Sequence, residues 1–375
     1  MRILQLGKFY PIQGGVEKVM FDLLDGMSKQ GITCDMLCAN AYVGQSLRII
    51  QHNDNSQIIS TSTLCKKFAT MISPQMVVEL RKICSNYDII HVHHPDPMAA
   101  LALFFSGYKG KVVLHWHSDI LKQKKLLMFF MPFQKWLIKR ADVIVGTTPI
   151  YIAQSPHLQT VQEKCTYIPI GIEKVTDNKE RTEAIKEKYS DKKIIFSLGR
   201  LVSYKGFEYL VDAANYLPDN CIVLIGGAGP LINALQEQIA DCHLQEKVVL
   251  LGRVSDEDLP SYYAACDLYC LSSVMKTEAF AIVQLEAMSF GKPIVATNIP
   301  ESGVSWVNAH QESGLNVPIK DGKALADAII EILADNELYE KLSNGAKNRF
   351  NHLFQKEKMI ETCLDIYKNT LELNN

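Results

Sequence analysis

Short apolar runs alternate with longer amphipathic stretches along most of the chain. Runs of aliphatic and β-branched residues are typical of buried strands, and the stretches between them have the period of helices. Such alternation predicts α/β domains with parallel sheets. The expected strands are Ile3–Leu6, Thr33–Cys38, Ile89–Val92, Val112–Trp116 and Val143–Gly146, then Ile194–Leu198, Ile222–Ile225, Val248–Leu251, Leu268–Leu271 and Pro293–Ala296.

The pattern breaks between Glu173 and Lys193, where the chain becomes charged and nearly free of apolar residues. The length of 375 residues also exceeds what one core usually serves. We therefore predict two Rossmann-like domains that face each other across an interdomain cleft. The first is expected to cover residues 1–172 and the second residues 173–354, with a closing helix at 355–375 that returns to the first.

Composition is ordinary for a globular protein, with 47% hydrophobic and 21% charged residues. No apolar run reaches the roughly 20 residues that span a bilayer, and the N-terminus lacks the apolar region of a signal peptide. Ten irregularly spaced cysteines are typical of reduced core thiols. We expect a cytoplasmic protein. Its net charge of −2 is uneven, however, because residues 1–173 carry +6 and the remainder −8.

Several polar residues and glycines follow predicted strands of the first half. In parallel sheets, ligands bind beyond the carboxyl ends of the strands. One site between the domains would collect these residues together with those of the second half. They are Gly14, Gly15, His91, His93, His94, His115 and His117.

Arg200 and Lys205 lie on a loop that follows a strand of the second half. Two cations there could converge on one anion, and a diphosphate suits the bidentate arginine and the point charge of lysine. A solvated surface pair is the alternative. The glycine-rich Gly226-Gly-Ala-Gly-Pro230 follows the next strand and resembles a phosphate loop, although glycine-rich turns alone are weak evidence.

Glu278 and Glu286 stand eight positions apart at the start of an apolar, helix-like run. Eight residues of a helix turn about 800°, so the two carboxylates are expected on nearly the same face. Glu286 lies among apolar residues and needs a partner, because an unpaired buried carboxylate costs several kcal/mol. Sugar hydroxyls would serve as donors. An N-terminal charge followed by an ordinary core helix is the bland alternative.

Other ligand classes find little support. The dinucleotide fingerprint GxGxxG is absent after the first strand and in the glycine-rich loop, which disfavours a dehydrogenase, and no Walker sequence occurs. Strand alternation puts His91 and His93 on one face and His94 on the other, which suits a pocket wall better than a metal site. Asp256-Glu-Asp258 follows Ser255 and is interpreted as a capped helix start, so no metal is expected.

Leu121–Arg140 carries six basic residues and no acid, interleaved with aromatic and aliphatic residues. Such a mixture can lie at an anionic membrane surface. A buried helix with a solvated basic edge is the alternative. Nucleic acid is disfavoured because the chain as a whole is slightly acidic.

Together these residues resemble the retaining glycosyltransferases of the GT-B fold, family-four type, which use nucleotide sugars. The resemblance covers nearly the whole chain and is greatest to bacterial enzymes of O-antigen and surface-polysaccharide synthesis, including mannosyl- and hexosyltransferases. It rests on the ordered motifs Gly14–Glu17, His117-Ser-Asp119, Gly199–Gly206, Glu278–Glu286, Gly291–Thr297 and Glu312–Pro318.

The resemblance implies residue roles. Arg200 and Lys205 would bind the donor diphosphate, and Glu286 the ribose hydroxyls. Glu278 and His117 would face the donor sugar, and Gly15 would let the backbone approach it. Further donor contacts are implied at Gly14, Gly227, Arg253, Phe280, Ala281, Ile282 and Val283, and acceptor-side contacts at His93, His94 and Asp119.

The implied reaction is transfer of a hexose, with mannose favoured, to a lipid-linked oligosaccharide at the inner face of the plasma membrane. The configuration would be retained without a divalent metal or a protein nucleophile. The expected donor is GDP-mannose, followed by a UDP-hexose, and no cofactor is expected. Alternatives are another sugar-nucleotide reaction, such as 2-epimerisation of a UDP-sugar, and a non-enzymatic sugar-nucleotide sensor.

One position departs from the family pattern. Members often have glycine on both sides of the phenylalanine after the first glutamate, whereas this chain has Ala279-Phe280-Ala281. The added methyl groups leave less room beside the donor, which bears on the identity of the sugar.

Overall fold

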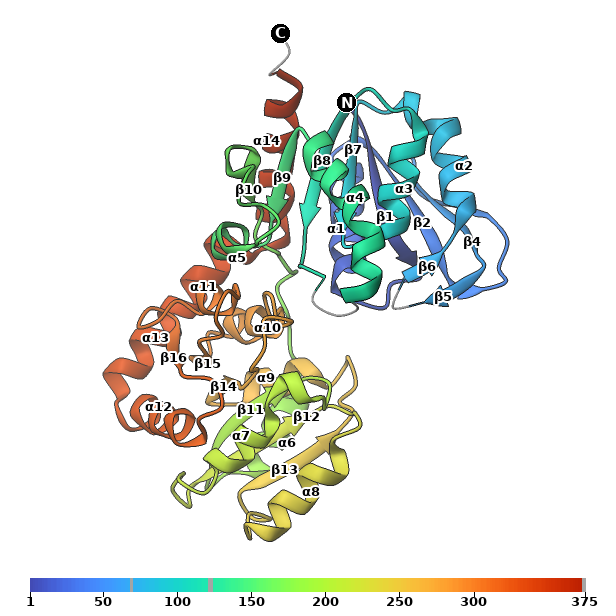
Figure 1. Cartoon of the computed structure of the whole chain (residues 1–375). Helices are drawn as coiled ribbons and strands as arrows, with labels where there is room; N and C mark the ends of the chain where they lie inside the picture. Colours follow the sequence, from blue (N-terminus) through green and yellow to red (C-terminus); the bar gives the residue numbers. More distant parts are fainter. Residues whose placement is uncertain (68–69, 121–123, 373–375) are drawn as a thin grey trace. The chain divides into compact units, whose positions relative to one another are not determined.

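The computed structural model describes residues 1–67, 70–120 and 124–372, with the backbone alone at 124–129. The chain forms two compact units (Figure 1). Unit 1 runs from Met1 to Ile170 and also contains the last helix, α14 (Lys356–Glu372), and unit 2 runs from Gly171 to Gln355.

Unit 1 contains a sheet in the order β10-β9-β8-β7-β1-β2-β4-β3. Its strands pair in parallel except β3, which pairs antiparallel with β4. A separate two-stranded sheet pairs β5 (Cys65–Lys67) antiparallel with β6 (Thr70–Ile72). The strands of the large sheet are β1 (Arg2–Tyr10), β2 (Thr33–Val43), β3 (Arg48–Asn53), β4 (Ser56–Thr63), β7 (Ile89–His94), β8 (Lys111–Trp116), β9 (Val143–Gly146) and β10 (Cys165–Tyr167).

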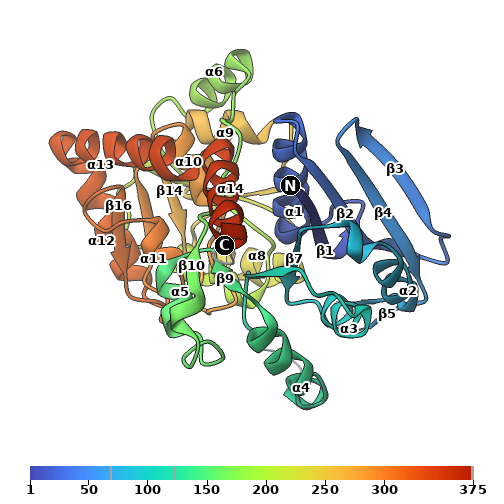
Figure 2. The same cartoon turned by 90° about the horizontal axis from the view of Figure 1, so that it is seen from above.

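Helices cover both faces of this sheet, as Figure 2 shows from above. On one face, α1 (Gly15–Lys29) packs against α14. On the other, α2 (Pro74–Ile83), α3 (Pro97–Ser106) and α4 (Lys124–Arg140) lie side by side. The short segments are η1 (Cys84–Asn86), α5 (Pro149–Gln154) and η2 (Gln162–Lys164).

Unit 2 contains an all-parallel sheet in the order β13-β12-β11-β14-β15-β16. A core of buried aliphatic residues joins one face of the sheet to α7, α8 and α12. The other face packs against α9 and α10, and α6 packs on α9. The strands are β11 (Lys193–Leu198), β12 (Cys221–Gly226), β13 (Val248–Gly252), β14 (Leu268–Leu271), β15 (Ile294–Thr297) and β16 (Gly314–Val317).

The helical segments of unit 2 precede, connect or follow these strands, and the colours of Figure 1 give their order along the chain. They are α6 (Lys179–Lys188), η3 (Ser203–Lys205), α7 (Phe207–Ala213), α8 (Ile232–Asp241), α9 (Leu259–Ala265), α10 (Val283–Ser289), α11 (Val304–Val307), α12 (Gly322–Ala334), α13 (Asn336–Arg349) and η4 (Phe350–Phe354).

The predicted fold class, α/β with parallel sheets in two domains, is confirmed. In both units, most of the residues singled out from the sequence lie in the carboxyl-terminal half of a strand or in the loop that follows it, whereas Glu286 lies in α10. Each sheet therefore presents its candidate residues along one edge, which is where this topology leaves a crevice for ligands.

Candidate active site

Lys205 and Glu278 meet at the carboxyl edge of the unit 2 sheet. Lys205 ends the turn η3 after β11, and Glu278 lies on the loop after β14. The Lys205 Nζ lies 2.5 Å from the Glu278 Oε2, which also accepts a hydrogen bond of 3.0 Å from the Ser273 hydroxyl. Each of the paired side chains is only 11% exposed. Such burial reduces solvent screening and strengthens the ion pair.

Arg200 lies beside the same turn and is exposed. Its Nη2 donates a hydrogen bond of 3.1 Å to the Tyr204 hydroxyl. Arg200 forms no ion pair within the part of the chain that the structure describes, so its remaining donors can reach a ligand. Arg200 thus supplies a cation at the edge where Lys205 is already paired.

The Gly227 loop packs directly against the backbone that carries Arg200. A Cβ at Gly227 would lie 1.9 Å from the Gly199 carbonyl oxygen, and the φ of Gly227 is +140°. The Leu201 amide donates to the Ala228 carbonyl at 3.0 Å, which fixes the two loops together. Only glycine fits this close backbone approach. Arg253 lies after the neighbouring strand β13 and is exposed.

The prediction that Glu278 and Glu286 share a helix face is wrong. Helix α10 begins only at Val283, and the preceding residues form turns, with a left-handed φ of +63° at Ala281. Glu278 therefore reaches the site from a loop, whereas Glu286 lies within the helix. The tight turn places Phe280 and Ala281, both buried, and Ile282 just ahead of the helix start.

Glu286 has a protein partner that the sequence did not reveal. Its Oε2 accepts a hydrogen bond of 2.6 Å from the Tyr263 hydroxyl on α9. Burial raises the pKa of Glu286, while the bond from Tyr263 acts in the opposite direction. Tyr263 satisfies one carboxylate oxygen and orients the group. A carboxylate held in this way can accept hydrogen bonds from a pair of vicinal hydroxyls.

Unit 1 brings four of the predicted histidines into one buried stack. His91 and His93 from β7 lie against His115 from β8 and His117 just after it, with nearly parallel rings. The His93 Nδ1 lies 2.9 Å from the His117 Nε2. Burial, together with the charge that each neighbouring histidine would carry, lowers the pKa of His93 and His117 well below the usual range. The stack is therefore neutral at physiological pH.

His94 points to the opposite face, as strand alternation predicts. Its ring stacks on the Trp116 indole at a centroid distance of 3.8 Å. Asp119 is buried, and its Oδ1 accepts hydrogen bonds from the Trp116 indole at 2.9 Å and the Ser155 hydroxyl at 2.7 Å. The structure thus places Asp119 and His94 around one tryptophan and apart from the histidine stack.

A charged cluster that was not predicted lies next to the glycines after β1, where a Cβ at Gly14 would lie 2.7 Å from the Glu17 carboxylate. Gly14 precedes α1, which begins at Gly15. Nearby, the Lys8 Nζ donates to the Pro95 carbonyl and its backbone amide donates to the Asp96 carboxylate. Burial lowers the pKa of Lys8, and the charges of Asp96 and Glu17 oppose this shift. A single lysine after a strand-like run does not indicate that its side chain is buried beside carboxylates.

One group among the described residues has the spacing of a metal site, namely His91, His93 and His115, whose nitrogens lie within 4.8 Å of one another. Both ring nitrogens of His93, however, already have hydrogen-bond partners, Gln5 and His117. A metal would have to break one of these bonds. The other two members differ, because the His91 Nε2 and both ring nitrogens of His115 have no hydrogen-bond partner among the described residues. The expected absence of a metal stays a prediction.

Asp256-Glu-Asp258 forms a turn before α9, which begins at Leu259, so these acids precede the helix and do not form its first turn. The Ser255 hydroxyl accepts from the Asp258 amide at 3.1 Å, and Arg181 pairs with Asp258 at 2.7 Å and with Glu257 at 3.6 Å. Ser255 thus caps the turn, and two of the acids have a cationic partner.

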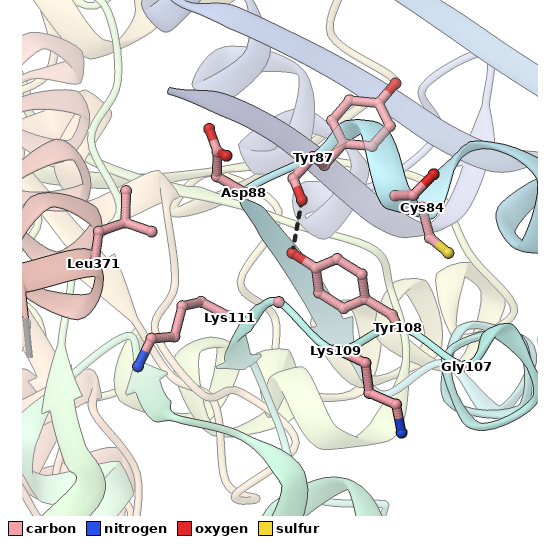
Figure 3. Close-up of a pocket in the computed structure, with 10 residues that line it drawn as sticks. Cys84, Tyr87, Asp88, Gly107, Tyr108, Lys109, Lys111 and Leu371 are labelled. Atoms are coloured by element: carbon pink, nitrogen blue, oxygen red, sulfur yellow. Dashed lines mark hydrogen bonds between the residues drawn. The ribbon is translucent and has the colours of Figure 1, made fainter. Parts of the chain in front are cut away.

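A pocket of about 540 Å³ lies elsewhere in unit 1, beside the amino ends of β7 and β8 (Figure 3). Three of its polar side chains are already engaged. The Tyr108 hydroxyl donates to the Tyr87 carbonyl at 3.0 Å, the Asp88 carboxylate accepts from the Arg2 amide at 2.7 Å, and Lys111 pairs with Asp142 at 3.4 Å. In this topology the ligand edge is the opposite one. The pocket is not the candidate site.

Comparison with known proteins agrees with this geometry. The family profile of glycosyl transferases group 1 matches residues 178–349, and that of glycosyltransferase family 4 matches residues 13–174. The O-antigen chain mannosyltransferase C of Escherichia coli is 30% identical over 99% of both chains. The D-rhamnosyltransferase WbpZ of Pseudomonas aeruginosa is 29% identical over 94% of this chain and 92% of its own.

Solved structures give the same fold. Sucrose-phosphate synthase from Thermosynechococcus elongatus superposes with a TM-score of 0.77 at 19% identity over the whole of both chains. HepE from Anabaena in complex with UDP gives 0.77 at 20% identity over 98% of this chain and all of that one. Fold and site together define a glycosyltransferase of the GT-B class. The chain belongs to glycosyltransferase family 4.

Proposed function

We propose that the protein transfers a hexose, most favourably mannose, from a nucleotide sugar to a lipid-linked oligosaccharide in O-antigen or related polysaccharide synthesis. The observation that carries the proposal is the Lys205–Glu278 ion pair beside the exposed Arg200, at the carboxyl edge of the unit 2 sheet. Two cations there suit a diphosphate, and the carboxylate suits sugar hydroxyls.

The choice of sugar rests on relatives. The full-length match to an O-antigen chain mannosyltransferase supports mannose and the polysaccharide acceptor. A Mycobacterium tuberculosis mannosyltransferase described as GDP-mannose-dependent is 29% identical over 49% of this chain, which supports GDP-mannose as the donor. The epimerase and the sensor find no comparable support.

The reaction that we propose retains configuration at the transferred carbon. The bond from this carbon to the diphosphate breaks, the acceptor oxygen bonds to the same face, and the diphosphate takes the proton of the acceptor hydroxyl. Arg200 and Lys205 would stabilise the charge that develops on the leaving group. Glu286, oriented by Tyr263, would hold the ribose hydroxyls, and Glu278 and His117 would face the sugar.

A membrane-bound acceptor is supported by an aromatic and basic surface on unit 1. Phe104 and Phe105 on α3 are 42% and 55% exposed, and the Phe104 ring contacts Phe133 and Trp136 of α4. Lys135, Lys139, Arg81 and Lys82 on α4 and α2 are exposed cations. No described helix has the length and apolar character needed to cross a bilayer. Peripheral binding at the inner membrane face is what this surface supports.

A thermal-shift screen of GDP- and UDP-sugars tests the donor. A donor at 100 times its dissociation constant stabilises the fold by roughly 2.7 kcal/mol. We expect GDP-mannose to give the largest shift and Arg200→Ala to diminish it. If only UDP-hexoses stabilise the protein, the donor is a UDP-hexose and not GDP-mannose. If no sugar nucleotide stabilises it, the proposed function is refuted.

The reaction is also expected to proceed without a divalent metal, because two side-chain cations can neutralise the diphosphate. Transfer should therefore persist in EDTA. Complete loss of transfer in EDTA, restored by manganese or magnesium, would show that a metal takes part. The histidine group and Asp256-Glu-Asp258 would then be the first positions to substitute.

A further inference from the structure

Gln5 lies fully buried at the centre of β1, next to the histidine stack. Its amide nitrogen donates to the Tyr367 hydroxyl of α14 at 3.1 Å and approaches the Cys34 sulfur at 3.6 Å. Its amide oxygen lies 2.7 Å from the His93 Nε2. A fully buried amide in a strand must satisfy its polar atoms, and this one does so on both sides.

The direction of these bonds determines which nitrogen of His93 carries its hydrogen. A carbonyl oxygen only accepts, so the His93 Nε2 must be the donor to Gln5. A neutral imidazole has one hydrogen, which leaves the His93 Nδ1 as an acceptor. Its partner at 2.9 Å, the His117 Nε2, must then donate. His117 therefore carries its hydrogen on Nε2, and its Nδ1 has a lone pair that can accept a hydrogen bond.

The four rings of the stack differ in their access to solvent. His91 and His93 are fully buried and His115 is 1% exposed, whereas His117 is 5% exposed. The chain of bonds thus runs from the interior of unit 1 to the histidine nearest the surface, at the carboxyl edge of the sheet. A group outside the stack can contact His117. The tautomer of His117 decides whether its remaining ring nitrogen donates a hydrogen bond to that group or accepts one from it.

We propose that Gln5 and His93 are positioning residues that hold His117 with its hydrogen on Nε2, so that Nδ1 accepts a hydrogen bond from a sugar hydroxyl. Tyr367 orients Gln5 by accepting from its amide nitrogen. This inference rests on the proposed function, because it assigns His117 a hydroxyl donor as its partner. A group that can only accept hydrogen bonds, such as a carboxylate or phosphate oxygen, would find no donor at the His117 Nδ1.

The tautomer can be observed directly, without activity. Long-range proton–nitrogen correlation spectra of protein with ¹⁵N-labelled histidine distinguish the two neutral tautomers, and His117→Asn assigns the signal. We expect the Nε2-protonated pattern for His117 in the wild type. A hydrogen on Nδ1 would mean that the Gln5 amide is reversed, and would overturn the proposal.

Two variants test the positioning role. Gln5→Leu removes the acceptor and should give His117 a mixture of tautomers, with kcat for transfer about 10-fold to 100-fold lower, the scale of losing a partner that orients a functional histidine. Tyr367→Phe should cause a smaller change of the same kind. The affinity for GDP alone should not change, since the nucleotide is assigned to unit 2.

Tyr87→Phe is the matched control. It also removes a buried tyrosine hydroxyl from unit 1, one that donates to Asp35 at 2.6 Å and not to the stack. Its His117 spectrum and kcat should match the wild type. If Gln5→Leu leaves the His117 tautomer and kcat unchanged, Gln5 has no positioning role. If the tautomer is as expected but no sugar nucleotide is used, the proposed function fails while the tautomer assignment stands.

Discussion

Arg200 and Lys205 are both cations of one edge, yet their surroundings differ. Arg200 is exposed, so its loss would remove the proposed diphosphate contact at little cost to folding. Lys205 is paired with the almost buried Glu278, so its loss also leaves a carboxylate without its cation. Substitution of Arg200 therefore tests ligand binding alone, whereas substitution of Lys205 tests ligand binding and local stability together.

Arg200→Ala and Lys205→Ala should each lower turnover by roughly two to three orders of magnitude, the scale of losing one preorganised charge-stabilising group. Steady-state transfer assays measure this. Lys193→Ala is the control, because Lys193 pairs with Asp267 at the amino end of β11, away from the site. Wild-type turnover in both test variants would remove the diphosphate assignment.

Ala281 occupies a conformation that glycine adopts freely and alanine does not. Its φ of +63° places the Cβ close to its own carbonyl, at a cost of roughly 1–2 kcal/mol. Ala279, on the other side of Phe280, has no such φ, so the left-handed conformation that favours glycine occurs at only one of the two positions. The strain lies in the turn between Glu278 and α10.

Ala281→Gly should raise the unfolding free energy by about 1 kcal/mol, because the strain is relieved. Urea titration measures this. Ala279→Gly, two residues earlier and without a positive φ, should instead be neutral or destabilising. Equal effects of the two substitutions would show that the backbone at Ala281 is not strained.

At the scale of elements, α14 is attached to α1 by a buried cation. The Lys356 Nζ lies 3.1 Å from the Asp25 carboxylate and 3.3 Å from that of Asp22, and all three side chains are less than 10% exposed. Burial alone would raise the pKa of Asp25, but hydrogen bonds from His52, Lys29 and Lys356 outweigh it and lower the pKa below its usual range.

Lys356→Met should therefore destabilise unit 1 by about 3–5 kcal/mol at pH 7, because it leaves buried carboxylates with fewer cations. A carboxyl with a lowered pKa contributes stability above its unfolded pKa of about 3.9 and loses it as pH falls further. The difference between wild type and variant should shrink between pH 5 and pH 3 in urea titrations. Lys358→Met, on an exposed position of the same helix, should show little change at either pH.

Strand elements were readable from the sequence because apolar runs of a buried parallel sheet are continuous. The predicted Val143–Gly146 and Leu268–Leu271 coincide with β9 and β14. The strands β3 and β4 were missed because their polar and apolar residues are mixed, as suits an antiparallel edge. The helix expected from Glu278 was wrong because residues 278–282 are irregular, with bends and a turn, and apolar periodicity does not reveal such a segment.

The site was predictable only as far as strand ends could be located. His91, His93, His115 and His117 were found because each lies near a strand end, and parallel pairing brings them together. Tyr263 and Tyr367 could not be found in this way. Tyr263 contacts Glu286, and Tyr367 contacts His91, each from a different helix or strand of the fold. Only the tertiary packing brings the two residues of each pair within hydrogen-bond distance.

At the scale of the whole molecule, the helices α2, α3 and α4 of unit 1 carry exposed cations and two exposed phenylalanines. Lys122, Lys124 and Lys125 of the basic stretch fall outside the described side chains. Lys135 and Lys139 lie within them, on the same helix as Phe133 and Trp136. Membrane binding can therefore be tested with positions whose exposure is known.

The protein should bind reversibly to vesicles that contain anionic lipid, and binding should weaken as salt rises. Each cation near the surface contributes about 1 kcal/mol, so Lys135→Gln with Lys139→Gln should weaken binding about 10-fold to 30-fold. Vesicle co-sedimentation measures this. The same double change at the exposed Lys186 and Lys188 of unit 2 should have no effect. If wild-type protein ignores anionic vesicles at low salt, the surface has another role.

The chain path of α14 has a consequence for synthesis on the ribosome. Unit 1 begins at the first residue but needs its last helix, and all of unit 2 is translated in between. At about 5–20 residues per second, residues 171–355 take on the order of ten to forty seconds. During that interval the nascent unit 1 lacks α14. Gln5 has no Tyr367 to bond, and Asp22 and Asp25 have no Lys356 to pair with. Synthesis of unit 1 thus starts before that of unit 2 and is completed after it.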